Sequence, residues 1–200
     1  MKVKHLFFIG IVLVVLLVFF QDFLGRKSKD DYGADLKKAR AKRDEFFKND
    51  KKSPLKDKTG FVALNYYEPN EQFRIKANVE FLPKSAPFAI ATTSGEAQNY
   101  EKFGYAVFMY QDIKRKLLLL KKTGDKSLFL PFADLTNNQT TYGGGRYLDV
   151  EMPRTDEVFI DFNLAFNPFC VYDDSFVCPI PPKENYLDFL VEAGEKKLKE

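Results

Sequence analysis

The residues from Phe73 to Phe81 alternate between apolar and polar side chains, and this alternation constrains the fold more than any other feature of the sequence. Successive side chains point to opposite faces of a strand, so the pattern predicts a sheet with one buried face. Eight further segments are also expected to form strands: Phe61–Tyr67, Phe88–Thr93, Tyr105–Tyr110, Arg115–Lys122, Ser127–Phe132, Arg146–Val150, Val158–Phe162 and Leu187–Glu192.

The connections between these segments are short, as in the tight turn expected at residues 123–126, and short connections join antiparallel neighbours. Residues 34–49 have a thin apolar stripe at helical spacing, and Ser53-Pro54 would end that helix. We therefore expect a mainly β (α+β) domain. It would be an antiparallel β-barrel or sandwich with an N-terminal helix packed on it, preceded by one transmembrane helix.

The transmembrane helix is expected in the apolar run Leu6–Phe20, which lies between the length of a signal sequence and that of a full span. Neither a small-residue cleavage site nor a cysteine follows the run, which favours an uncleaved anchor over a cleaved signal peptide. The predicted organisation is an anchor (or signal peptide) over residues 1–24, a stalk over 25–33 and a β-rich domain over 34–200.

The basic residues on the two sides of this run nearly balance, so the positive-inside rule hardly distinguishes the two orientations. The basic residues before a short apolar run favour an extracytoplasmic C-terminal domain. We expect a single-pass protein of a cell envelope, held in the membrane by residues 6–24. Secretion after signal cleavage is the alternative.

The only histidine is His5, so the predicted domain contains none. That excludes Ser-His-Asp and Cys-His catalytic machinery and the usual zinc or iron ligand sets, and we expect no metal and no cofactor. The net charge of +3 includes Lys2 and Lys4, which precede the apolar run. The nearly neutral remainder argues against nucleic acid as a partner.

Polar residues gather in two segments. In the first, Gly143–Gly145 and Arg146 indicate either an anion pocket or a glycine-rich loop whose arginine pairs with Asp134 or Asp161. In the second, Asp161 and Asn163 would share one face of a strand and Asn167 would begin a turn. These side chains are either satisfied internally or directed into a cleft.

Cys170 and Cys178 are the only cysteines, and a disulfide between them suits an oxidising compartment. Two free thiols, or a metal site that also uses Asp173 and Asp174, are the alternatives. Further along, Glu184 and Asn185 read either as turn residues or as part of a site in which Glu184 and Asp161 or Asp134 form a carboxylate pair.

Read together, PFADLTNNQTTYGGGRYLD, IDFNLAFNPFCVYDDSFVCPIPPKENYL and EAGEK resemble the domain-of-unknown-function family 1684 over about residues 40–197. The resemblance implies no known reaction, cofactor or substrate. It implies that a shared network or cleft contains the matching residues Asp134, Thr141, Tyr142, Gly145, Arg146, Asp161, Asn163, Asn167, Cys170, Tyr172, Cys178, Pro179 and Asn185.

Three functional hypotheses follow. The first is a non-catalytic module that binds a ligand or serves as an accessory subunit of an envelope protein complex. The second is a histidine-independent hydrolase or transferase with a pocket around Arg146 and Asp161, in which Asp161 or Glu184 exchanges protons and Tyr142 donates a hydrogen bond. The third is a cytoplasm-facing domain with a redox or metal-binding thiol pair.

Overall fold

The structure, a computed structural model, describes residues 31–83, 87–122 and 124–198. The predicted membrane anchor and nearly all of the predicted stalk lie outside the described residues. Among the helices of the described ranges, none has the length and apolar character that a bilayer crossing requires.

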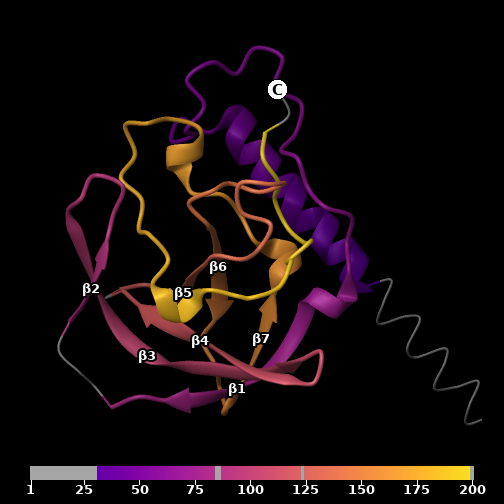
Figure 1. Cartoon of the computed structure of the whole chain (residues 1–200). Helices are drawn as coiled ribbons and strands as arrows, with labels where there is room; N and C mark the ends of the chain where they lie inside the picture. Colours follow the sequence, from indigo (N-terminus) through magenta and orange to yellow (C-terminus); the bar gives the residue numbers. More distant parts are fainter. Residues whose placement is uncertain (1–30, 84–86, 123, 199–200) are drawn as a thin grey trace, which may run out of the picture. The chain divides into compact units, whose positions relative to one another are not determined.

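Seven antiparallel strands form one sheet, in the order β6-β5-β4-β3-β1-β7, with β2 paired to β3. Although β6 and β7 end this order, they lie next to each other, so the sheet curls into a nearly closed barrel (Figure 1). The prediction of a mainly β fold is confirmed. The strands are β1 (Arg74–Phe81), β2 (Phe88–Ala91), β3 (Ala97–Tyr110), β4 (Ile113–Lys121), β5 (Ser127–Phe132), β6 (Arg146–Glu151) and β7 (Glu157–Asp161).

The barrel interior holds the main hydrophobic core, and the alternation in β1 places Ile75, Ala77 and Val79 there. Leu117–Leu120 of β4 are buried on both faces, because Leu118 and Leu120 pack with Ile90 and Tyr100 in a second, smaller cluster. Strands covered on both faces read as continuous apolar runs, as β4 does.

Within the described residues, helical structure is limited to residues 31–49 and four short 3-10 helices. The part of the long helix from Lys42 onward belongs to the same compact unit as the strands, Lys42–Glu200. In that part the Phe47 ring meets the Tyr172 ring edge-on, with centroids 4.7 Å apart, which confirms packing on the domain. The 3-10 helices are η1 (Glu71–Phe73), η2 (Phe162–Leu164), η3 (Phe169–Val171) and η4 (Lys183–Asn185).

Two predicted strands are wrong. Residues 61–67 form only an isolated bridge, between Tyr66 and Glu195. Residues 187–192 form no strand. Among the described residues, their backbone bonds to other backbone groups only at Ala133, through the Leu187 amide, and at Leu135, through the Phe189 carbonyl, and a bend lies at residues 188–189. The alternation there has another cause, since every second side chain enters the core: Leu187, Phe189, Val191 and Ala193. We call residues 185–197 the C-terminal segment, drawn in yellow in Figure 1.

The backbone at Gly194 shows how tightly the C-terminal segment packs against the rest of the domain. Its φ is +77°, and an added Cβ would lie 2.6 Å from the Phe162 carbonyl oxygen. We expect Gly194→Ala to lower the free energy of unfolding by at least about 2 kcal/mol, measured by chemical denaturation. Gly60→Ala is the matched control, because Gly60 has φ +76° but open space at the Cβ position. Equal losses in the two variants would contradict the tight fit.

Candidate functional site

Arg146, at the start of β6, is 0% exposed and pairs with the buried Asp134 at 2.9 Å. Its Nη2 also donates to the Val191 carbonyl at 2.8 Å, and its Nη1 donates to the carbonyls of Ala193 and Glu195. One guanidinium thus satisfies alternate carbonyls of the C-terminal segment, which suits the fixed fork of donors in arginine.

Asp134 completes this arrangement from the other side. Its Oδ1 accepts hydrogen bonds from the Val191 amide at 3.1 Å and the Thr136 amide at 2.8 Å, while its Oδ2 binds Arg146. Burial lowers the pKa of Arg146 and the Asp134 charge opposes that effect. The pair therefore acts as a clamp on the C-terminal segment. The sequence left Asp134 and Asp161 open as partners of Arg146, and the structure shows that the partner is Asp134.

Two buried asparagines also bond to backbone where strands are missing. Asn185 lies between β4 and β5, which share only one aligned pair. Its amide bonds both the N–H and the C=O of Leu118 and the C=O of Pro131. Asn163 bonds the N–H and C=O of Asn70 in the same reciprocal way, each at 2.8 Å. The side-chain amide of Asn185 thus takes the place of a strand residue between β4 and β5, and that of Asn163 holds the chain at the start of η1.

Glu195, 1% exposed, is the centre of a second polar network in the Lys42–Glu200 unit. Oε2 accepts from Arg43 Nε and from the Asn167 amide, both at 3.2 Å, and Oε1 accepts from Asn167 Nδ2 at 3.0 Å and from the Tyr172 hydroxyl. Arg43 also stacks over the Phe166 ring at 4.4 Å. This network joins the end of the helix to the C-terminal segment.

The two cysteines lie close together as free thiols, and the Cys170 amide donates to Cys178 Sγ at 3.2 Å. The predicted disulfide is therefore absent from this structure, and pairing under oxidising conditions stays a prediction. Burial and the neighbouring Cys178 raise the pKa of Cys170 to about 12, which keeps its thiol protonated at neutral pH. The described residues contain no group of three or more His, Cys, Asp or Glu suited to hold a metal ion.

The glycines of the glycine-rich loop are closely packed within the fold, which favours the structural interpretation of this loop. The side chains of Asn138 and Tyr142 lie against Gly143 and Gly144, where an added Cβ would clash with them. Gly145 has φ +89° and approaches the Phe132 carbonyl. The glycines thus allow close internal packing, and Tyr142 stays half-buried near Cys170.

The predicted pocket around Arg146 and Asp161 is wrong for Arg146, which has no exposed surface, whereas Asp161 lines a pocket between β6 and β7. Asp161 ends β7 and caps η2, where its Oδ1 accepts from the amide of Asn163 at 3.1 Å. Glu184 forms a surface ion pair with Lys102 at 3.4 Å, so it is not part of a carboxylate pair with Asp161 or Asp134.

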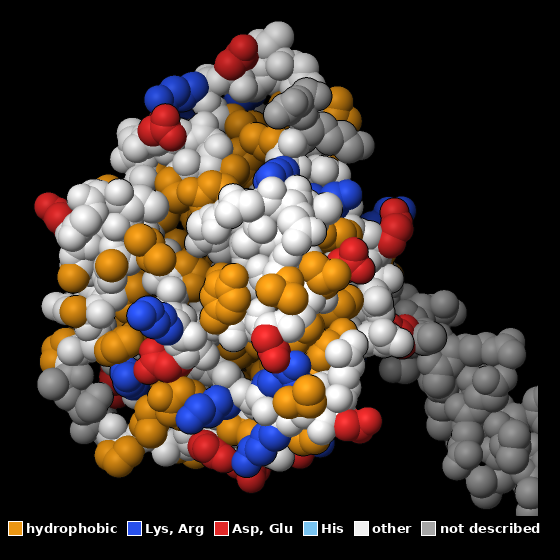
Figure 2. Space-filling view, viewed as in Figure 1, with side chains coloured by type: hydrophobic (Ala, Val, Ile, Leu, Met, Phe, Trp, Pro, Cys, Tyr) orange, Lys and Arg blue, Asp and Glu red, His pale blue; other side chains and the backbone are white. Residues whose placement is uncertain are grey.

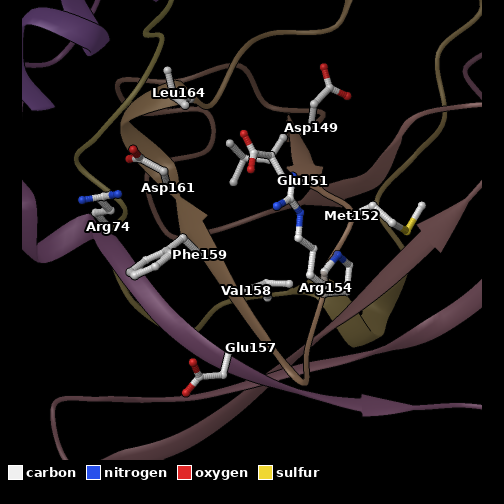
Figure 3. Close-up of a pocket in the computed structure, with 12 residues that line it drawn as sticks. Arg74, Asp149, Glu151, Met152, Arg154, Glu157, Val158, Phe159, Asp161 and Leu164 are labelled. Atoms are coloured by element: carbon white, nitrogen blue, oxygen red, sulfur yellow. The ribbon is translucent and has the colours of Figure 1, made fainter.

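A pocket of about 370 Å³ opens between β6 and β7, at the seam where the barrel does not close by pairing. Figure 3 shows Arg74 and Asp161 on one side of it and Asp149 and Glu151 on the other. Its lining includes neither Arg146 nor Glu184. Phe159 at 52% and Leu164 at 42% are exposed apolar side chains at the same place. This seam is the candidate binding site.

Of the residues of this seam the sequence reasoning singled out only Asp161, and it missed the Arg43–Glu195 pair. One available signal was the alternation Leu148-Asp149-Val150-Glu151, which places both carboxylates on the solvent face of a strand. For Arg43 and Glu195 the sequence carries no such signal, since 152 positions separate them.

The clamp leads to a prediction for Arg146→Lys. A lysine has a compact charge without the planar fork, so it cannot serve Asp134 and three carbonyls together. We expect the free energy of unfolding to fall by roughly 2–4 kcal/mol in chemical denaturation. Arg154→Lys, at an exposed position, should change it by less than about 0.5 kcal/mol. Equal stability of the two variants would rule out the clamp.

Glu195 leads to a prediction about pH. Burial raises its pKa from 4.5 to about 7, against the opposing effects of Arg43 and Asn167. The folded chain therefore holds this proton more tightly than the unfolded chain. Its contribution to stability is complete below about pH 4.5 and is lost as the pH rises through about 7, a change of roughly 3 kcal/mol.

The measurement is the free energy of unfolding from pH 4.5 to 8 for the natural chain and for Glu195→Gln. The glutamine stays neutral, so its curve should lack this decline with rising pH, and the difference between the two curves isolates Glu195. Parallel curves would show that Glu195 titrates alike in the folded and unfolded states.

Known proteins resemble this chain in sequence and in fold. A family described as "Protein of unknown function (DUF1684)" matches residues 59–196. The solution NMR structure of the uncharacterized protein from gene locus rrnAC0354 of Haloarcula marismortui is similar, with a TM-score of 0.69 and 33% sequence identity. The match covers 85% of this chain and 96% of that one. No curated protein matches. The chain, with its nearly closed barrel and clamped C-terminal segment, belongs to the DUF1684 family.

Proposed function

We propose that this chain is a membrane-tethered, non-catalytic binding module, displayed on the extracytoplasmic side of a bacterial cell envelope as an accessory subunit. One observation carries the non-catalytic part. Arg146, which the enzyme hypothesis placed in its pocket, is buried and bonded within the fold, and so are the motif residues Asn163 and Asn185. Groups committed in this way hold the architecture and are not free to contact a substrate.

The seam between β6 and β7 supports the binding part. It combines a concave surface, exposed apolar side chains and charges of both signs, and pockets of about 300 Å³ and above are typical of ligand sites. On the face shown in Figure 2, acidic and basic side chains are interspersed with hydrophobic ones, without a broad basic surface of the kind that nucleic acid requires. A protein segment or a small ligand suits such a surface better.

The tether rests on the apolar run Leu6–Phe20 and on the basic residues before it. A tethered module needs no diffusing substrate, because its role is to hold a partner at the membrane surface.

The test of this proposal is topology and membrane attachment in cells. We expect the full chain to stay in the membrane fraction after alkaline extraction. A protease added to intact spheroplasts should reach a tag placed after Glu200. Release into the soluble fraction would contradict the proposed tether. Cleavage of the tag only after cell lysis would contradict the proposed orientation.

A further inference from the structure

The outer edge of β6 is paired at one residue and free beyond it. The Tyr147 amide donates to the Phe166 carbonyl at 2.8 Å, and the Phe166 amide donates to the Tyr147 carbonyl at 2.9 Å. The backbone groups of a strand repeat every second residue, so those of Asp149 and Glu151 point the same way. Strand β6 pairs only with β5, and these groups have no hydrogen-bond partner among the described residues. The edge is therefore open for further pairing.

The facing edge of β7 has the same character. The Val79 amide donates to the Asp156 carbonyl at 2.6 Å, so the backbone groups of Glu157, next along the chain, point away from β1. By the same repeat, those of Phe159 point toward the seam. The buried side chains of Leu148 and Val158 line the pocket between the two edges. The seam thus offers unpaired backbone above an apolar floor.

Charge along the seam is uneven. The side chains of Asp149 and Glu151 are exposed and lack an ion-pair partner among the described residues, whereas Glu157 is paired with Lys76 at 2.7 Å. The basic residues of the lining are Arg154, in the turn after β6, and Arg74, at the start of β1. The two free carboxylates share the outer face of the open edge. An incoming strand would place its own side chains directly opposite them.

We propose that the seam binds a short extended segment of a partner protein, with Lys or Arg at alternate positions, which pairs with the open edge of β6. This deepens the proposed binding function and rests on it. The two basic residues lie opposite Asp149 and Glu151 and exchange backbone hydrogen bonds with them. The residue between faces the floor of Leu148 and Val158, so a small apolar side chain suits that position.

The test uses the full chain in neutral detergent micelles and fluorescent peptides read by anisotropy. We expect a peptide with the core Lys-Val-Lys to bind and one with Glu-Val-Glu to bind at least tenfold more weakly. The double variant Asp149→Asn, Glu151→Gln should weaken binding of the basic peptide by roughly fivefold or more. Glu96→Gln, at an exposed position in the β2–β3 turn, is the matched control and should leave binding unchanged.

A second peptide separates strand pairing from simple charge attraction. Methylation of the backbone nitrogen of the second lysine removes a donor that must reach β6, and we expect it to abolish binding. Equal binding of the methylated peptide, or of the acidic one, would overturn the proposal. So would failure of the basic peptide to bind, in which case the charges along β6 serve to prevent strand pairing. Such a failure leaves the membrane test of the proposed function untouched, so the two can fail separately.

Discussion

The buried ion pair between Arg146 and Asp134 is the interaction on which the rest of this structure depends. A buried pair is costly to desolvate, and its attraction alone seldom recovers that cost. Here both partners have further roles, because together they bond the amide of Val191 and the carbonyls of Val191, Ala193 and Glu195. The pair thus satisfies backbone groups that a regular ladder would otherwise satisfy. That allows an irregular segment to enter the core of a small barrel.

Buried side-chain amides satisfy backbone groups in the same way at two other places. Asn185 bonds across the gap between β4 and β5, and Asn163 fixes the chain at Asn70. Gly194 allows the C-terminal segment to pass close to the carbonyls of Phe162 and Ala165. The polar residues of the clamp and the two asparagines suggest a functional site in the sequence because they lie beside apolar ones. In the structure their side chains form hydrogen bonds with backbone groups. The candidate binding surface lies elsewhere, at the open seam between β6 and β7.

Most of the barrel could be predicted from the sequence because its strands alternate or form short apolar runs. The segment Ser127–Phe132 matches β5 residue for residue, and the alternation of Phe73–Phe81 led directly to β1. The rule that alternation predicts a strand failed at Leu187–Glu192. There every second side chain enters the core although the segment forms no ladder. The resemblance grouped Arg146 with Asp134, and Asn167 with Tyr172. It could not tell a buried network from a cleft, because that difference depends on which distant backbone each side chain meets.

Hydrogen exchange of the C-terminal segment tests this account most directly. The amides of Leu187, Val191 and Glu195 bond to the Ala133 carbonyl, the Asp134 carboxylate and the Ala165 carbonyl. If the clamp holds the segment in the core, these amides exchange as slowly as those of the buried strand residues Leu117 and Leu148, through opening of the whole domain. Fast exchange at Val191 while Leu117 and Leu148 remain protected would mean that the segment detaches from a barrel that is stable without it, and the account would fail.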